Sequence, residues 1–303
     1  MGTGLTEAPL ALFTTLAPMA AASFIVLAYA FIAGKPTAEE ARRLDRWTAV
    51  PAAVMLVAIV AAFFHLANPL AAAGVFAGVG RSPLSNELLV VVLFSLVALV
   101  YWLLGLAGKL PAQGGARAGL LVVLAIGSVV LACACGMAYL IPTVPTWDNL
   151  LGVVAMVGYA LIGGAALGAV VCAGARVTLP KSAPVLGAAL AAVGLVLALG
   201  AWAAQMAGLS AVVNIWGPAS ALVPDLGLMV GLFALCAVAC AVLLFLGKKG
   251  IGGAAGAATT GAASAAPRVV ALPVFAVAAV VLAAVGIFVL RIAFYGLYMG
   301  IAL

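Results

Sequence analysis

Residues 88–107 read LLVVVLFSLVALVYWLLGLA and contain no Asp, Glu, Lys or Arg. A helix needs about 20 mostly apolar residues to cross roughly 30 Å of hydrocarbon, so this stretch is long enough to span a membrane. Seven further stretches share this character, and only the last holds a charged residue: 8–33, 47–66, 118–140, 149–173, 183–207, 226–246 and 269–296. The sequence therefore predicts eight transmembrane helices.

The overall composition supports the same conclusion. Of the 303 residues, 68% are hydrophobic and 7% are charged, whereas a soluble domain carries about 25% charged residues. Strands of a membrane barrel would be shorter and would alternate polar with apolar side chains. We therefore expect an all-α fold, with residues 1–303 forming one multi-pass transmembrane domain in the inner (cytoplasmic) cell membrane.

The positive charge of the chain is distributed unevenly between the two sides of the predicted bundle. Of thirteen Lys and Arg residues, eleven fall in the alternate loops 34–46, 108–117, 174–182 and 247–268. The other loops and both termini hold only Arg81, and Arg291 lies within the last helix. Because basic loops stay on the cytoplasmic side, we expect both termini outside. The net charge of +6 thus indicates orientation in the bilayer, and no nucleic-acid partner is expected.

Proline and glycine indicate local features of the helices and loops. Pro18, Pro51 and Pro273 should each kink a helix or lie in its first turn. Gly164 and Gly168 form a GxxxG pattern that would let two helices approach closely. The basic loop 247–268 is rich in Gly and Ala, which predicts a flexible segment. Acids near the starts of four helices favour N-terminal capping, for which we expect Glu7, Asp148 and Asp225.

The outer loops contain proline and two tryptophans, Trp147 and Trp216. Stiff loops with exposed aromatic side chains can form a docking surface for a partner protein. An aromatic belt at the membrane interface would explain the two tryptophans equally well.

One histidine and one glutamate are candidates for proton chemistry. His65 ends the second predicted helix and Glu87 begins the third, so both lie at the outer boundary. A histidine, with an ordinary pKa near 6.5, and a carboxylate together could accept the two protons of a quinol. The alternatives are an interfacial histidine and a capping glutamate. Arg291 could reach the interface, pair with a buried acid or hold a quinone oxygen.

The single histidine also excludes some cofactors. Bis-His haem ligation within this chain is impossible, and Met/His ligation would have to use His65. The five cysteines lie inside the predicted helices and form no CxxC pair, which favours a packing role. We therefore expect no haem and no Fe–S cluster in this chain.

Short segments spread over nearly the whole sequence resemble the membrane-anchor subunit of dimethyl sulfoxide reductase. They are Pro9-Leu10…Phe13-Thr14, Phe24–Leu27, His65-Leu66…Pro69, Val79-Gly80…Leu84–Glu87, Thr143–Trp147, Ala221–Asp225 and Arg291…Phe294–Gly296. Their order and spacing over eight predicted helices carry the resemblance. The turn after the histidine departs from the family pattern, since Ala67 and Ala71 stand where the family often has glycine and a basic residue.

The resemblance implies a function and two partner subunits. The anchor would oxidise menaquinol at His65 and Glu87, with Asn86, Arg81 and Arg291 as further quinol-binding residues. A four-cluster Fe–S subunit would relay the electrons, and a molybdopterin catalytic subunit would reduce the terminal acceptor. Both would dock on the outer face. The alternatives are an anchor of a polysulfide or nitrite reductase type, a purely structural anchor, and a membrane transporter. Against a transporter, no charged residue lies at a helix midpoint.

The charge distribution makes a testable prediction about topology. Reporter fusions after Gly34, Gly108 and Gly250 should report the cytoplasm, and fusions after Gly80, Ile141 and Leu303 should report the outside. Paired activity-based reporters, one active on each side of the membrane, provide the measurement. A reversed pattern would refute the orientation.

Overall fold

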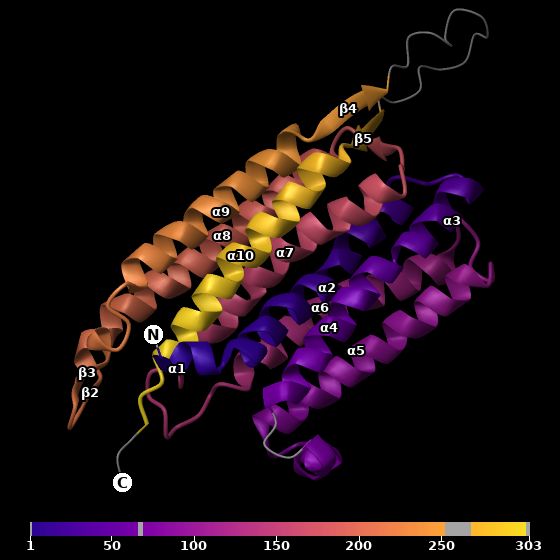
Figure 1. Ribbon diagram of the computed structural model, residues 1–303. Helices are drawn as coiled ribbons and strands as arrows, with labels where there is room; N and C mark the ends of the chain where they lie inside the picture. The colour runs from indigo at the N-terminus through magenta and orange to yellow at the C-terminus, as the bar shows by residue number, and fades with distance from the viewer. Residues whose placement is uncertain (1, 66–68, 252–267, 301–303) are drawn as a thin grey trace, which may run out of the picture.

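Eight long apolar helices form the body of the protein (Figure 1). The computed structural model describes residues 2–65, 69–251 and 268–300. Within those residues eight helices are long and apolar enough to cross a membrane, as the sequence predicts. They are α2 (Ala8–Ile32), α4 (Ala49–His65), α5 (Pro83–Leu106), α6 (Gly115–Met137), α7 (Leu151–Gly174), α8 (Ala183–Gly208), α9 (Leu226–Leu246) and α10 (Pro273–Gly296). The span of α4 also includes the preceding helix α3 (Ala38–Trp47), so that it runs over Ala38–Phe64.

The eight helices form two groups of four. We call α2, α4, α5 and α6 the first bundle and α7 to α10 the second bundle. In Figure 1 the first runs from indigo to magenta and the second continues to yellow. Helix α2 joins them, because it packs closely on α4 and α6 in its own bundle and on α7 in the other.

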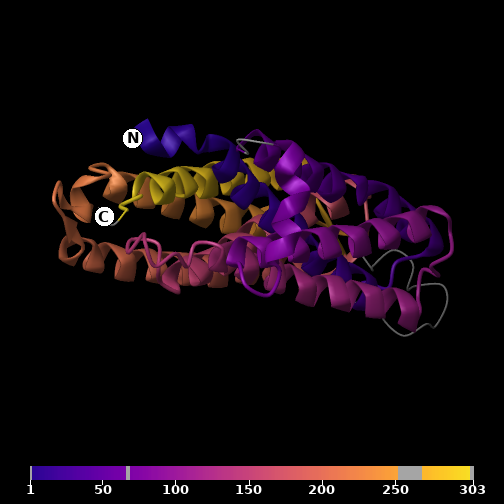
Figure 2. The ribbon, with the colours of Figure 1, turned by 90° about the horizontal axis from the view of Figure 1, so that it is seen from below.

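Both termini lie at the same end of the molecule, as Figures 1 and 2 show. The short helix α1 (Gly2–Thr6) packs there against the last turns of α10. We call this the termini end, and the opposite end, where the basic loops lie, the basic end. The structure thus agrees with two termini on one side of the bilayer, while the identity of that side stays a prediction.

Short elements outside the long helices add some strand to the expected all-α fold. At the basic end β1 (Leu179–Pro180), β5 (Arg268–Ala271) and β4 (Lys248–Ile251) form an antiparallel three-stranded sheet. The termini end carries η1 (Pro69–Gly78), η2 (Leu209–Ala211), η3 (Ala219–Ala221) and the hairpin of β2 (Val213–Asn214) with β3 (Gly217–Pro218). The flexible-loop prediction for 247–268 is wrong at its two ends, where the backbone pairs as β4 and β5; residues 252–267 lie outside the described part.

The basic end is held together by buried and half-buried charged groups. Helix α3 (Ala38–Trp47) begins with a capping box between Thr37 and Glu40. The other carboxyl oxygen of Glu40 accepts hydrogen bonds from the backbone N and the hydroxyl of Thr178, at 2.9 and 2.7 Å. A carboxylate with this many donors fixes α3 against the loop that follows α7.

A buried ion pair links the α3 segment to α6. Nη1 and Nη2 of Arg117 donate to the two carboxyl oxygens of Asp45 at 2.6 and 3.1 Å. The same guanidinium donates to the carbonyls of Pro111 and Leu110 and to the hydroxyl of Tyr101. The sequence places Arg117 in a loop, but the structure buries it in the first turn of α6, because Asp45 completes its hydrogen bonding.

Pro51 and Pro273 lie in first turns as predicted, a kink at Pro18 stays a prediction, and the structure shows no side-chain capping hydrogen bond for Glu7 or Asp225. Pro18 lies inside α2, Pro51 in the first turn of α4, and Pro273 at the start of α10. Glu7 and Asp225 occupy N-cap positions of α2 and α9 without a side-chain cap hydrogen bond. Asp148 precedes the N-cap of α7, which is Leu150.

Small residues let α2 and α7 meet at backbone distance. A Cβ atom on Gly164 would lie 2.5 Å from the backbone carbon of Ala22, and one on Gly168 would clash with Val26. Gly163 likewise faces Met19. The GxxxG pattern therefore marks a close helix contact, as predicted, and the contact joins the two bundles.

This close contact yields a prediction about stability. Gly164→Ala should destabilise the protein by about 1–3 kcal/mol, because the added methyl group overpacks the contact with α2. Gly200→Ala in α8 is the matched control, since a Cβ atom there meets nothing within 4 Å; the better helix propensity of alanine should make it neutral or slightly stabilising. Unfolding midpoints in detergent provide the measurement. Equal midpoints for the two variants would contradict the account.

Candidate functional site

The buried carboxyl group of Glu87 is the centre of the candidate site. Helix α5 begins at Pro83, with Ser82 as its N-cap, so Glu87 lies in the second turn on the inward face. Its side chain is only 5% exposed. Its Oε1 atom has no hydrogen-bond partner among the described residues. Cys135 of α6 forms a hydrogen bond with the carboxyl group, and Arg291 of α10 interacts with it electrostatically.

His65 is the last residue of α4, at the termini end. Helices α4 and α5 are neighbours in sequence order and in the first bundle. The backbone thus places His65 and Glu87 at the same end of two adjacent helices, as predicted. The structure does not describe the His65 side chain, and residues 66–68, which include Ala67 of the turn after it, lie outside the described part.

Two of the expected site residues, Arg81 and Asn86, lie away from the Glu87 carboxyl group. Both are exposed, in the turn before α5 and in its first turn. The side-chain Oδ1 of Asn86 accepts a hydrogen bond from the Gly80 backbone N at 2.7 Å, and the Arg81 guanidinium donates to the Ala77 backbone carbonyl at 3.0 Å. These bonds stabilise the turn that leads into α5.

Arg291 is buried among neutral polar and aromatic groups. Its side chain is 2% exposed, so it does not reach the interface. Nε donates to the Thr14 hydroxyl of α2 at 2.8 Å, and Nη2 donates to the Tyr295 hydroxyl at 3.0 Å. The Tyr295 hydroxyl also bonds to that of Tyr139. The guanidinium carbon lies 4.3 Å from the centre of the Phe294 ring, a cation–π distance.

The aromatic rings around Arg291 form one packed cluster. Trp147 stacks on Phe294 with a centroid distance of 5.2 Å and donates from Nε1 to the Phe294 carbonyl at 2.9 Å. Tyr139 packs edge-on against both rings. Trp147 is therefore partly buried in internal packing, and its share in a docking surface stays a prediction. Trp216, at the tip of the β2–β3 hairpin, is 86% exposed.

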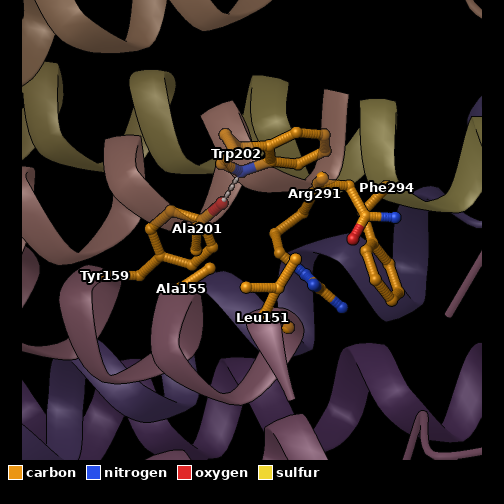
Figure 3. Close-up of a pocket in the computed structure, with 9 residues that line it drawn as sticks. Leu151, Ala155, Tyr159, Ala201, Trp202, Arg291 and Phe294 are labelled. Atoms are coloured by element: carbon orange, nitrogen blue, oxygen red, sulfur yellow. Dashed lines mark hydrogen bonds between the residues drawn. The ribbon is translucent and has the colours of Figure 1, made fainter. Parts of the chain in front are cut away.

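A small pocket lies beside Arg291 between α7, α8 and α10 (Figure 3). Figure 3 shows Arg291 and Phe294 facing Leu151 and Ala155, with Tyr159 and Trp202 closing one side. The Trp202 Nε1 donates to the Tyr159 hydroxyl at 2.5 Å. The volume is about 20 Å³, which is room for roughly one water molecule.

Several residues of this region were not predicted from the sequence. Thr14, Tyr139, Tyr295 and Cys135 come from α2, from the residues just after α6, from α10 and from α6. Tyr295 follows Arg291 by four positions, so the spacing of one helical turn could have indicated that pair. The other contacts join residues far apart in the sequence, and no local pattern indicates them. Within the described ranges, no cluster of three or more His, Cys, Asp or Glu side chains is arranged to hold a metal ion.

Comparisons with known proteins agree with this architecture. The family model of the DMSO reductase anchor subunit (DmsC) matches residues 1–297. The YnfH subunit of an anaerobic dimethyl sulfoxide reductase of Escherichia coli (strain K12) is 32% identical over 225 residues, which cover 74% of this protein and 77% of that one. The C subunit of the anaerobic dimethyl sulfoxide reductase of Haemophilus influenzae is 31% identical over 151 residues, or 50% of this protein and 53% of the relative. With eight apolar helices and this match, the protein belongs to the DMSO reductase anchor subunit family and is a multi-pass membrane anchor of a DMSO reductase-type complex.

Proposed function

We propose that this anchor oxidises menaquinol at its termini end and passes the electrons to an Fe–S subunit. The observation that carries the proposal is the buried Glu87 carboxyl group, whose Oε1 atom has no partner among the described side chains. An unsatisfied buried polar atom costs about 1–3 kcal/mol. A quinol hydroxyl would donate the missing hydrogen bond, so substrate binding would relieve that cost.

Oxidation of a quinol releases two protons and two electrons. The site therefore needs an acceptor for each proton and an electron acceptor nearby. Glu87 accepts one proton in the proposal. His65, at the end of the adjacent helix, accepts the other, because an imidazole takes up and releases protons near neutral pH. Both protons then leave at the termini end.

Arg291 supplies a fixed positive charge near Glu87. Its guanidinium stays protonated, and Thr14 and Tyr295 hold it in place. A cation held by such a preorganised network stabilises the negative charge that develops on a quinol oxygen as its proton departs. Arg81 and Asn86 contribute indirectly, since their hydrogen bonds position the turn before α5.

The electrons need an acceptor near the termini end. In this proposal the anchor holds neither haem nor Fe–S cluster, and its single histidine cannot form a bis-His haem site. The four-cluster Fe–S subunit therefore docks on the termini end, which faces outward, with the molybdopterin subunit beyond it. Ile215 and Trp216, both highly exposed at the hairpin tip, offer an apolar contact of the kind that interfaces bury.

The proton-acceptor roles can be tested by substitution. His65→Ala and Glu87→Gln should leave the complex assembled and slow menaquinol oxidation by about tenfold or more, within the range of general-base contributions. Asp225→Asn is the matched control, because this exposed acid lies at the same end without a cap hydrogen bond. The measurement is quinol-dependent turnover of the membrane-bound complex. Assembled variants with wild-type turnover would remove both residues from the site.

The docking face can be tested by cross-linking. Photoreactive groups attached to cysteines at Ile215, Ser220 and Leu150 should capture the Fe–S subunit, because these exposed residues lie at the termini end. Lys109 and Lys249, exposed at the basic end, are the controls. Immunoblots for the Fe–S subunit give the readout. Capture from the lysine positions instead would place the partner on the other face.

A further inference from the structure

The two bundles differ in how their outer helices meet. In the second bundle α8 and α9 pack closely along their length, whereas α4 and α5 of the first bundle touch at few places. A cavity of about 520 Å³ lies between α4 and α5, with Ala20 and Phe24 of α2 also lining it. This volume falls in the range of about 300–1,000 Å³ that is typical of ligand sites.

The lining of the cavity suits an apolar chain and does not suit water. Most of the lining is Ala, Leu, Ile, Met and Phe, and two of its polar groups are already satisfied. The Thr48 hydroxyl donates to the Leu44 carbonyl at 2.9 Å, and the Trp102 Nε1 donates to the Asp45 carbonyl at 2.9 Å. The Ser95 hydroxyl alone lacks a partner among the described residues, and a bound water needs two to four polar partners.

The side chains around the cavity open toward the hydrocarbon of the bilayer. Leu56 and Leu99 line the cavity and remain 62% and 44% exposed. Their neighbours Val60 on α4 and Leu103 on α5 are also exposed apolar side chains of these membrane-spanning helices. A molecule that enters between α4 and α5 therefore comes from the lipid phase.

The cavity begins roughly two helical turns from the proposed proton acceptors. It is lined by the same two helices that carry His65 and Glu87. On α5 the buried residues Glu87, Val91 and Phe94 follow one face, and Phe94 lines the cavity. At 1.5 Å per residue, Phe94 lies about 10 Å along the helix from Glu87, and Ile59 lies about 9 Å from His65 on α4.

We propose that this cavity holds the first isoprene units of the polyprenyl tail of the quinol. The inference rests on the proposed function, because the head group must lie at His65 and Glu87 for the tail to enter here. With the head group there, the tail runs along α4 and α5 toward the basic end and leaves into the bilayer through the opening between them. The site thereby selects long-tailed quinols over tail-less ones through apolar burial.

The test fills the cavity and compares two substrates on the intact complex. Ala52→Phe and Ala98→Phe should raise KM for long-tailed menaquinol by about tenfold, since the ring removes room from the tail. Turnover and KM with menadiol, which has no tail, should stay within about twofold, which also shows that each variant is assembled. Ala189→Phe, on the exposed face of α8, is the matched control and should change neither substrate.

The tail assignment is wrong if KM for long-tailed menaquinol is unchanged in the Phe variants, or if KM rises equally for both substrates.

A second experiment uses photolabelling. A quinone with a diazirine on its tail should label residues 48–59 and 94–102, and excess menaquinone should abolish the labelling. Competition by phospholipid but not by menaquinone would instead make the cavity an acyl-chain site. Failure of the proposed function is a separate result, seen as normal turnover of Glu87→Gln with both substrates.

Discussion

The backbone contact between α2 and α7 is the interaction on which the rest of the structure depends. In lipid there is no hydrophobic driving force between two apolar helices, so close van der Waals packing has to stabilise their contact. Gly163, Gly164 and Gly168 allow it, because each of these positions leaves no room for a side chain beside α2. Helix α2 belongs to the first bundle and α7 to the second. Thr14 of α2 also accepts a hydrogen bond from Arg291 of the second bundle. The contact between the bundles therefore helps to hold Arg291 of the second bundle beside the first.

Two buried charge clusters in the described residues, Arg117 with Asp45 and Arg291 near Glu87, differ in how fully their hydrogen bonds are satisfied. At the basic end Arg117 bonds to Asp45, to two carbonyls and to Tyr101, so its charge is neutralised and its donors are used. A pair with complete hydrogen bonding can persist in a protein interior without a ligand. At the termini end Glu87 keeps an oxygen without a hydrogen-bond partner among the described residues, and Arg291 donates hydrogen bonds to two neutral hydroxyl groups. The second arrangement leaves capacity for a substrate, and the first does not.

The length and number of the helices could be predicted because one dominant force decides them. Each stretch free of charge is long enough to cross the hydrocarbon, and the backbone must then satisfy its own hydrogen bonds as a helix. Glu87 was also predictable as a candidate, since an acid at the edge of an apolar run is costly. The contacts of Tyr139, the burial of Arg117 and the packing of Trp147 were not predictable, because each depends on a partner far away in the sequence. The pairing of β4 with β5 was missed for a related reason: Gly and Ala composition indicates flexibility, but hydrogen bonding between two distant loop ends leaves no local pattern.

The position of Arg291 on α10 has a consequence for how the molecule is assembled in the membrane. A lone arginine on an inserting helix is unfavourable in hydrocarbon, and the groups that stabilise this one include Thr14 on α2 and the ring of Tyr139, which precede it in the sequence. Helix α10, which carries Arg291, is thus the last of the eight to be synthesised. Thr14 and Tyr139 are synthesised before it. Docking of α10 onto α2 and completion of the polar cluster become a single event. A polypeptide that stalls before this step holds the other seven spans but lacks the arginine, so the polar cluster around Arg291 forms only once all eight spans have been inserted.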